Sequence, residues 1–425
     1  MIEIKAKYYY AQDGEVASDE IKKLFKLDEN ELLRVDSIRA SVFNIVGFIF
    51  KGEDVLVIYP KHFYSKTQID ALNLTHEENE DDIKLIYNVI KEYQEKEKTK
   101  AQARKYIGAK DSMEFEADYP FASFYEIYDY FKKYGLYKET EKLVKRGGKG
   151  KVSWKNTISK AQKIVAGGNL FFVPMYYNKE SQRNVFVTEC MAFVIDYTID
   201  FFHSFLSMKP TGYRNNSFDY LGNIDYVIGQ LNKAKKDVFK DKEKKLINSL
   251  IEFFVKYKAK SYGGSVHVKI RHFDKIWQTM VNQYLNKHFA GINSTNKSLV
   301  FDLMRTASAI PFSEQTFYVD ASHHGYNIRV DHIAQSGNEL YIFDSKYYQA
   351  LDDLEYKQFS YGELLREYYP GVTARYNVLL LPGTPRVDTH FSLAAPFVGS
   401  RRPYVEIIEQ YLDPKTVMED YLKRD

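Results

Sequence analysis

Two aspartates and a lysine in the C-terminal third of the chain have the types and spacing of a metal-binding site. Asp331, Asp344 and Lys346 lie within the segment NIRVDHIAQSGNELYIFDSKYY, residues 327–348. Carboxylate oxygens are ligands that hard divalent cations such as Mg²⁺ prefer. The lysine adds a positive charge two residues after the second carboxylate. These residues predict a site where a divalent cation and a lysine act on an anionic group.

The same segment predicts how the side chains meet. Two β-type runs flank a Gly-Asn pair at 337–338, which is a hairpin signal. With this pair as the loop, Asp331 lies directly opposite Asp344. Arg329 falls opposite Lys346, on the same face, because side chains alternate along a strand. Opposed like charges destabilise a purely structural hairpin, so this register favours a metal site over a surface hairpin with cross-strand ion pairs.

The chemistry of such a site follows from its donors. Asp331 and Asp344 would hold Mg²⁺ together with the Ser345 carbonyl, and we expect Mn²⁺ to substitute. A bound Mg²⁺ polarises a phosphate and lowers the pKa of a coordinated water. Lys346 would orient that water and stabilise charge on the phosphoryl oxygens. Neighbouring cations, Arg329 among them, would lower the pKa of Lys346.

The elements expected around the hairpin follow a diagnostic order. They are a helix, three strands, a helix and an apolar strand, at residues 272–289, 315–320, 327–334, 339–346, 352–368 and 376–381. This αβββαβ order is the core plan of the PD-(D/E)xK restriction-endonuclease-like fold, and an apolar last strand suits a sheet covered on both faces. We therefore expect an α+β multidomain protein whose residues 265–425 form a PD-(D/E)xK nuclease domain.

Auxiliary residues are sought on the flanking helices. The first helix offers Asp274 and Gln278, while Glu314 precedes the first strand. On the second helix, Gln358 and Tyr361 share one side with Lys357. Contact with a DNA backbone and ordinary helix-surface roles both remain open for that side.

Histidines offer an alternative metal centre, with His323, His324 and His332 near the aspartates. Asp331 and His332 are neighbours on a strand and point to opposite faces. They do not easily share an ion, so we expect His332 to pack on the other face, opposite Phe343.

A basic stretch at residues 142–155, KLVKRGGKGKVSWK, contains no acid. Its glycines predict a mobile loop, either solvated or contacting phosphates. The candidate DNA-binding residues are Lys145, Arg146, Lys149, Lys151 and Lys155. A helix is expected at 156–166, ended by Gly167-Gly168, and the GxxxxGK[ST] spacing of a P-loop is absent from the chain.

Bulk properties suit a multidomain globular protein. The chain has 425 residues and a net charge of +3, so a nucleic-acid footprint must come from local clustering. One cysteine excludes an internal disulfide framework. Without an uninterrupted apolar run, we expect no membrane span and a cytoplasmic location. We divide the chain into a β-rich and helical DNA- or partner-binding region at 1–160, a helical middle at 161–264 and the nuclease domain.

The chain resembles the LlaJI-type restriction endonuclease family, which is related to McrC-like nuclease subunits. The resemblance rests on VGFIFKGEDVLVIYPKHF (46–63), RGGKGKVSWKNTI (146–158), the helix with Phe273 and Ile276-Trp277, VDHI…FDSKYY, and KQFSY (357–361). It implies a nuclease of a bacterial restriction system acting on double-stranded DNA, with a McrB-like GTPase and a companion methyltransferase as candidate partners. Gln278 stands where an acidic residue is expected after the Ile-Trp pair.

The sequence therefore predicts a Mg²⁺-dependent DNA endonuclease of a restriction (antiviral defence) system, with Asp331, Asp344 and Lys346 as catalytic residues. Cutting both strands takes two active sites or two visits, so a homodimer is one expected arrangement. A repair or CRISPR-associated effector nuclease of the same fold is one alternative. The other is a non-catalytic DNA-binding specificity subunit that retains the fold.

Overall fold

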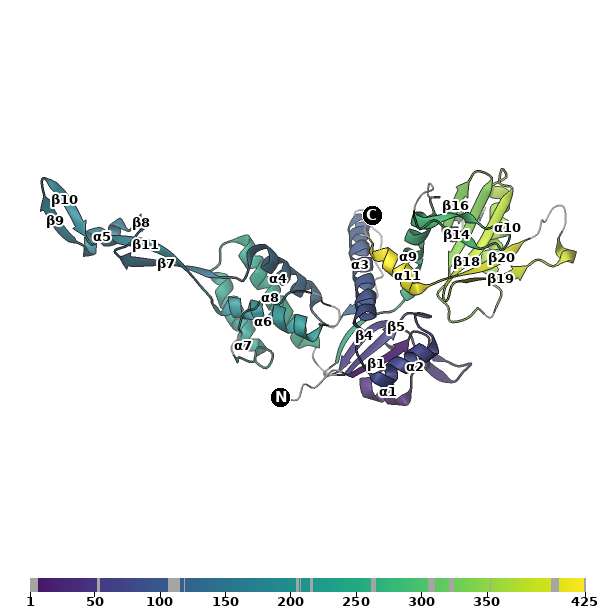
Figure 1. Ribbon diagram of the computed structural model, residues 1–425, viewed down its shortest axis with the longest axis horizontal. Helices are drawn as coiled ribbons and strands as arrows, with labels where there is room; N and C mark the ends of the chain where they lie inside the picture. The colour runs from purple at the N-terminus through teal and green to yellow at the C-terminus, as the bar shows by residue number, and fades with distance from the viewer. Residues whose placement is uncertain are drawn as a thin grey trace. The chain divides into compact units, whose positions relative to one another are not determined.

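The structure is a computed structural model of the chain. It describes residues 7–51, 54–105, 115–117, 119–203, 206, 208–214, 217–260, 265–304, 310–320, 325–351, 353–398 and 405–423. The chain forms two compact units, one of Met1–Ala117 with Gly263–Asp425 and the other of Asp118–Tyr262. Figure 1 labels their elements, and each unit is described by itself below.

The first unit contains a five-stranded sheet that joins distant parts of the chain. Its order is β1-β5-β4-β12-β6, with bounds Lys7–Gln12, Asp54–Tyr59, Val46–Lys51, Ser265–Ile270 and Phe115–Ala117. Strands β4 and β5 pair antiparallel as a hairpin. Gly47 (φ 141°) is required where β4 meets β12, because a Cβ there would lie 2.2 Å from the Val268 carbonyl oxygen. Strand β12 thus ties the C-terminal region to the N-terminal sheet.

Helices and a small hairpin complete this N-terminal region. The helices are α1 Asp19–Phe25, α2 Lys66–Thr75 and α3 Glu80–Lys105, and the hairpin pairs β2 Leu32–Val35 with β3 Ala40–Phe43. Ser65 accepts a hydrogen bond from the backbone N–H of Gln68 and closes a capping box at the start of α2. The first turn of α3 carries acidic residues, which favour a helix N-terminus.

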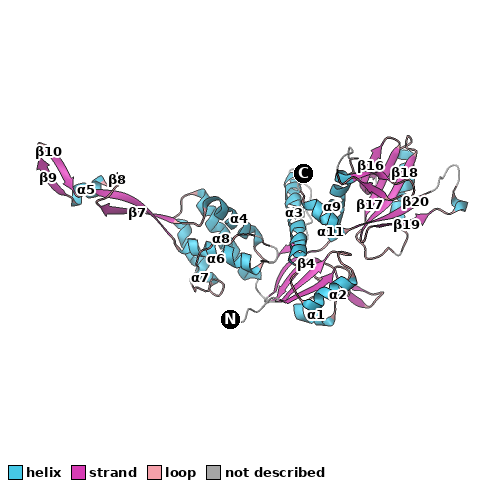
Figure 2. Cartoon of the chain, in the orientation of Figure 1, coloured by secondary structure: helices cyan, strands magenta, loops and turns pink. Residues whose placement is uncertain are grey.

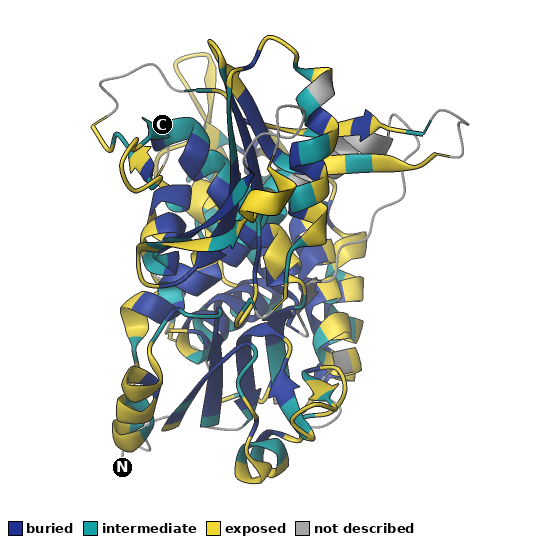
Figure 3. Cartoon of the chain, turned by 90° about the vertical axis from the view of Figure 1, so that its right-hand side faces the viewer, coloured by how far each residue is buried: buried dark blue, intermediate teal, exposed yellow. Residues whose placement is uncertain are grey.

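A six-stranded sheet also belongs to the first unit. Its order is β15-β16-β17-β18-β20-β19, with bounds Ser313–Tyr318, Asn327–Ser336, Glu339–Ser345, Ala374–Pro382, Glu406–Leu412 and Arg386–Ser392. Helices α9 Phe273–His288, α10 Tyr356–Tyr368 and α11 Pro414–Leu422 accompany it, with the short pair β13 Phe289–Ile292 and β14 Leu299–Phe301 and the 3-10 turn Ala395–Phe397. The predicted helix, three strands, helix and strand occur in the predicted order, but the short strands β13 and β14 stand between α9 and β15. Central strands β17 and β18 are largely buried (Figure 3).

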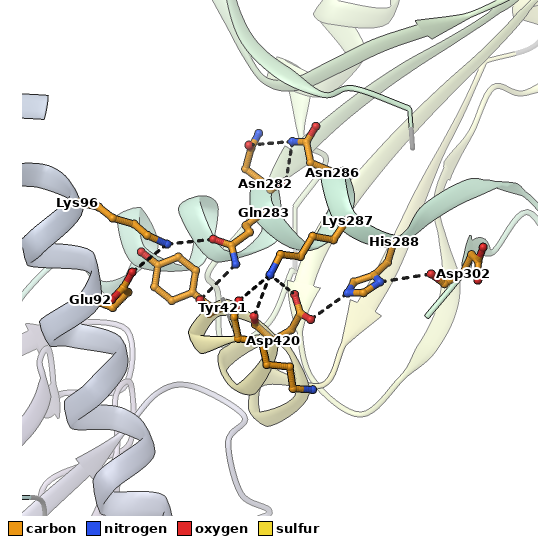
Figure 4. A network of polar contacts seen from close by, with 11 residues as sticks. Glu92, Lys96, Asn282, Gln283, Asn286, Lys287, His288, Asp302, Asp420 and Tyr421 are labelled. Carbon is orange, nitrogen blue, oxygen red and sulfur yellow. Dashed lines mark hydrogen bonds and ion pairs between the residues drawn. The ribbon is translucent and has the colours of Figure 1, made fainter. Parts of the chain in front are cut away.

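Helix α9 is anchored at its C-terminal half to α3 and α11 (Figure 4). Lys96 of α3 donates a hydrogen bond to the Gln283 side chain at 3.1 Å. Lys287 and His288 of α9 contact the Asp420 carboxylate of α11 at 3.7 and 3.0 Å. These charged groups are largely buried, and buried charges are tolerated when they are paired. The network therefore fixes the helix that leads into the C-terminal sheet.

The second unit combines a helical bundle with a β-arm (Figure 2). The bundle contains α4 Phe121–Tyr134, α6 Phe186–Phe201, α7 Ile224–Lys236 and α8 Asp241–Lys260. The arm contains β7 Glu139–Arg146, β8 Lys151–Val152, α5 Trp154–Lys160, β9 Gln162–Ala166, β10 Asn169–Val173 and β11 Tyr176–Arg183. None of the helices in the part of the chain that the structure describes is long and apolar enough to cross a bilayer.

Two predictions for this arm are wrong in part. The basic stretch is not one loop, because β7 and β8 both pair with β11, a partner that lies beyond the stretch in the sequence. The helix expected at 156–166 ends at Lys160, and β9 pairs with β10 around Gly167 and Gly168. Both glycines have positive φ (60° and 77°), which suits a tight hairpin turn.

The two units group the chain differently from the three expected regions. Residues 119–160 belong with the helical middle, and the N-terminal sheet belongs with the C-terminal sheet. The division into regions 1–160, 161–264 and 265–425 remains a prediction about which parts of the chain act as separate domains. The expected boundary at 261–265 falls mostly on residues outside the described ranges.

Candidate active site

The hairpin of β16 and β17 has the predicted register. Ile333 pairs with Ile342, and His332 pairs with Phe343. The next residues toward the open end are Asp331 and Asp344. Both line one pocket of about 330 Å³. Local strand alternation therefore places the two carboxylates together.

Asp344 is the more buried of the two acids, with 1% of its surface exposed. Its Oδ2 lies 2.8 Å from Lys346 Nζ, and its Oδ1 lies 3.9 Å from Lys357 Nζ. Oδ1 is buried and accepts no hydrogen bond from any described residue. Because buried acceptors are usually satisfied, this oxygen is suited to a ligand that the protein itself does not supply.

Burial and the neighbouring carboxylate of Asp344 also change the pKa of Asp331. Burial, and then the negative charge of Asp344, raise the pKa of Asp331 to about 7. The backbone N–H of Ser345 donates to Asp331 Oδ2 at 3.2 Å and opposes this shift. Two apposed carboxylates are costly when both are charged, and a divalent cation between them would remove that cost.

The donors present fit Mg²⁺. Among the described residues there is no group of three or more His, Cys, Asp or Glu side chains arranged around one point, which disfavours an all-protein cage. Mg²⁺ needs no such cage, since it is commonly bound by one or two carboxylates and keeps several waters. Asp331, Asp344 and the carbonyl of Ser345 would hold it here.

Lys346 stands between two carboxylates, as its Nζ lies 2.8 Å from Asp344 and 3.1 Å from Glu355. Burial by itself would lower the pKa of Lys346, but these carboxylates outweigh burial and raise it. The expectation of a lowered pKa is therefore wrong. Arg329 does not adjoin Lys346 in the strand ladder and pairs instead with Glu314 at 2.8 Å.

A chain of hydrogen bonds behind the site links α9 to Ser345. The Asn282 side-chain amide lies 3.0 Å from His332 Nδ1, and His332 Nε2 lies 2.7 Å from Ser345 Oγ. His332 is fully buried, and burial lowers its pKa to about 4, so the ring is neutral at pH 7. A neutral ring that accepts from Asn282 at Nδ1 donates to Ser345 from Nε2.

These contacts disfavour His332 as part of a histidine metal centre. Both ring nitrogens of His332 are engaged by protein partners, as expected for a residue packed opposite Phe343. His323 and His324 lie outside the described residues.

The auxiliary candidates separate into pocket and non-pocket positions. Asp274, at the start of α9, lines the pocket with the two aspartates. Gln278 instead donates to Glu314 at 3.3 Å. Asp274 is therefore the acid of this helix that the structure brings to the site.

Gln358 and Tyr361 of α10 point inward and not toward solvent. They are 0% and 1% exposed. Gln358 donates to the Ile342 carbonyl at 2.7 Å, and the Tyr361 hydroxyl donates to the Arg329 carbonyl. They hold α10 against the hairpin, so neither the DNA contact nor the surface role considered for them fits. Lys357, on the same helix, does line the pocket.

Sequence reasoning missed one residue that contacts Lys346 and several that line the pocket. Glu355 immediately precedes α10, and its only sequence signal was an acid at a helix start. Asp13, Asn44 and Lys61 reach the pocket from the N-terminal sheet. Lys61 belongs to the Pro-Lys-His-Phe turn after β5.

The five basic candidates lie on the arm of the second unit and are exposed. They are Lys145 and Arg146 in β7, Lys149 in the glycine turn, Lys151 in β8 and Lys155 in α5.

Comparisons with known proteins place these features in context. The profile described as LlaJI restriction endonuclease matches residues 45–394, which include the hairpin and most of both sheets. No curated protein matches the chain. A solved chain from an assembly of Thermococcus gammatolerans McrB AAA+ hexamers with bound McrC aligns over 97% of this chain and 98% of its own, at 12% identity and a TM-score of 0.33. That similarity is too low to establish a shared fold.

Proposed function

Because the chain belongs to the LlaJI restriction endonuclease family, we propose that it is a Mg²⁺-dependent DNA endonuclease of a bacterial restriction system. The observation that carries this proposal is the buried pair Asp331 and Asp344 with an unsatisfied Asp344 Oδ1 and an adjoining lysine. We assign residues 265–425 to the PD-(D/E)xK fold. The element order and the position of the acids on the open end of β16 and β17 support that assignment.

The proposed mechanism acts on a DNA phosphate that lies at the pocket. Mg²⁺, when bound, would polarise that phosphate and acidify a coordinated water, and Mn²⁺ should support the same chemistry. Lys346, kept protonated by Asp344 and Glu355, is suited to stabilise negative charge on the phosphoryl oxygens. In this proposal Lys346 is an electrostatic and orienting group.

Double-stranded DNA is the proposed substrate, and the arm supplies candidate contacts. Five of its exposed cations, Lys145, Arg146, Lys149, Lys151 and Lys155, lie within or close to a glycine turn whose backbone can approach phosphates closely. A McrB-like GTPase and a methyltransferase are proposed partners, because the family resemblance implies such a system. The chain has no P-loop spacing of its own, so a nucleotide-driven motor would act in trans.

Cleavage of duplex DNA tests the proposal. Wild-type protein, Asp344→Ala and the control Asp388→Ala would be assayed with Mg²⁺ or EDTA, with and without GTP, on methylated and unmethylated DNA. Asp388 is half-exposed on β19 and pairs with Arg386, so its loss leaves the pocket intact. We expect cutting by the wild type and the control, and none by Asp344→Ala. Undiminished cutting by a folded Asp344→Ala protein would overturn the assignment.

A further inference from the structure

The turn after β5 is hydrogen-bonded to the segment that follows Lys346. The backbone N–H of Lys61 donates to the Tyr347 hydroxyl at 2.8 Å. His62 Nε2 lies 3.2 Å from the Tyr348 carbonyl oxygen and 3.0 Å from that of Gln349. His62 has φ 59°, an uncommon conformation for a residue other than glycine. Two segments almost 290 residues apart in sequence are thus joined through both side chains and backbone.

The Lys61 side chain adds a partly buried ion pair to this joint. Its Nζ lies 3.5 Å from Asp13 Oδ2 and 3.4 Å from the Tyr347 carbonyl oxygen, and 4.5 Å above the Tyr347 ring. Asp13 is only 6% exposed. Desolvating such a pair offsets much of its attraction, so it contributes little net stability. Fixing one geometry is the better explanation for a pair placed here.

The joint acts on the backbone next to the candidate catalytic lysine. On one side, the Lys346 N–H donates to the Leu380 carbonyl of β18 at 2.9 Å. On the other side, Tyr347 is held by Lys61 and packs against Phe273 at the start of α9, with ring centroids 5.4 Å apart. The pocket wall contains Asp13 and Lys61 beside Asp344 and Lys346. The N-terminal sheet therefore bounds the same pocket as the metal-site acids.

We propose that Asp13, Lys61 and Tyr347 form a latch through which the N-terminal sheet positions Lys346 for DNA cleavage. The proposal rests on the proposed function, because it assigns a role to the cleavage site. The latch residues are positioning residues, since they act through the backbone that carries Lys346. It follows that the N-terminal sheet is part of the working nuclease and not only a separate binding region.

Two variants of the full chain test the latch. Asp13→Asn/Lys61→Met removes both charges together, so that no unpaired charge stays buried. Tyr347→Phe removes only the hydroxyl and keeps the ring against Phe273. The matched control is Lys66→Met on α2, which removes a lysine of the same region whose partner is the exposed Asp70 at 3.2 Å. Melting temperatures show that each protein is folded at the assay temperature.

The readouts separate positioning from stability. At saturating Mg²⁺ we expect both latch variants to lower the cleavage rate about 10- to 100-fold, because small misplacements of a catalytic group cost that much. Mn²⁺ affinity, measured by electron paramagnetic resonance, should be unchanged. Hydrogen exchange of the peptide that covers residues 346–351 should become faster, and the control should match the wild type in all three measurements.

The failures are distinguishable. A lower melting temperature with a normal cleavage rate and normal exchange would overturn the latch and leave the nuclease assignment standing. If the wild type cuts no DNA, the proposed function fails. The exchange experiment then still decides whether Asp13 and Lys61 order the segment after Lys346, and unchanged exchange in the double variant would reject that ordering.

Discussion

The ammonium group of Lys346 lies 2.8 Å from Oδ2 of Asp344, a residue that we propose as a metal ligand. One carboxylate therefore faces the lysine with Oδ2 and leaves Oδ1 without a hydrogen bond from the described residues. This arrangement divides the two functions of the site between the two oxygens of a single side chain. It predicts that metal binding and charge stabilisation can be separated by substitution.

Asp331→Asn should abolish cleavage and stabilise the metal-free protein. Burial and the adjacent Asp344 raise the pKa of Asp331 to about 7, so its charged form is disfavoured in the fold. A neutral amide of the same shape removes that repulsion, and we expect a gain of about 0.5–2 kcal/mol at pH 8 without Mg²⁺. Thermal unfolding in EDTA measures this. A lower melting temperature would contradict the crowding of the two acids.

Lys346→Met should lower cleavage about 100- to 1,000-fold, the usual effect of removing one group that stabilises transition-state charge. Mn²⁺ binding should persist, because Asp331 and Asp344 remain. Lys357→Met is the matched control, since its Nζ lies farther from Asp344, at 3.9 Å, and it should have the smaller effect. Equal losses in both variants, measured as single-turnover rates, would refute the special position of Lys346.

Asn282→Ala should weaken Mn²⁺ binding about tenfold, in the range seen when an outer hydrogen bond to a metal site is lost. The Asn282 side chain hydrogen-bonds the His332 ring, and the ring hydrogen-bonds the Ser345 hydroxyl. The backbone N–H of Ser345 donates to the Asp331 carboxylate. Isothermal titration measures the affinity. Thr279→Ala is the control on the same helix, because its hydroxyl donates to the Lys275 carbonyl within that helix. Wild-type affinity in Asn282→Ala would show that the hydrogen-bond chain is structural only.

Glu31→Gln should flatten the acid dependence of stability. Burial raises the pKa of Glu31, but His267 and Lys269 outweigh burial and lower it to about 2 from 4.5. A lowered carboxyl pKa contributes stability fully above the unfolded value, and this is lost as pH falls through the folded value. The wild type should therefore lose about 3 kcal/mol from this group between pH 4.5 and 2.

Urea unfolding across that pH window measures the loss. Glu31→Gln should show a smaller change, whereas Glu29→Gln, a neighbouring exposed acid, should follow the wild type. If all three proteins show the same change in the free energy of unfolding with pH, the Glu31 ion pair is not a source of acid sensitivity.

Neutralising the arm should reduce the salt dependence of DNA binding. Changing the five candidate residues Lys145, Arg146, Lys149, Lys151 and Lys155 to Gln removes up to five phosphate contacts, and each lost contact lowers the slope of log K against log salt by about 0.9. Fluorescence anisotropy on a labelled duplex at several salt concentrations gives the slope. The control replaces Lys233, Lys235 and Lys236 in the last turn of α7. If the slope falls only in the control, the DNA contacts lie on the helical bundle and not on the arm.

Local pattern alone determined the central part of the candidate site. The Gly-Asn loop and the period of two along a strand fixed the pairing of Ile333 with Ile342, which brings Asp331 and Asp344 together. The flanking helices α9 and α10 were also predictable to within a few residues, and in α9 apolar side chains recur along one face. The same local reasoning failed in the arm, where β7 and β8 become strands only by pairing with the later β11.

Only the tertiary structure decided what surrounds the two aspartates. Asp13 and Lys61 reach the pocket from a sheet at the other end of the chain. Glu355 meets Lys346, and Asn282 meets His332, without any sequence periodicity that links them. Periodicity reports the faces of one element, whereas contacts between distant elements depend on how whole sheets and helices pack. The meeting of Asp331 and Asp344 was therefore predictable from the sequence, and the groups that surround these two residues were not.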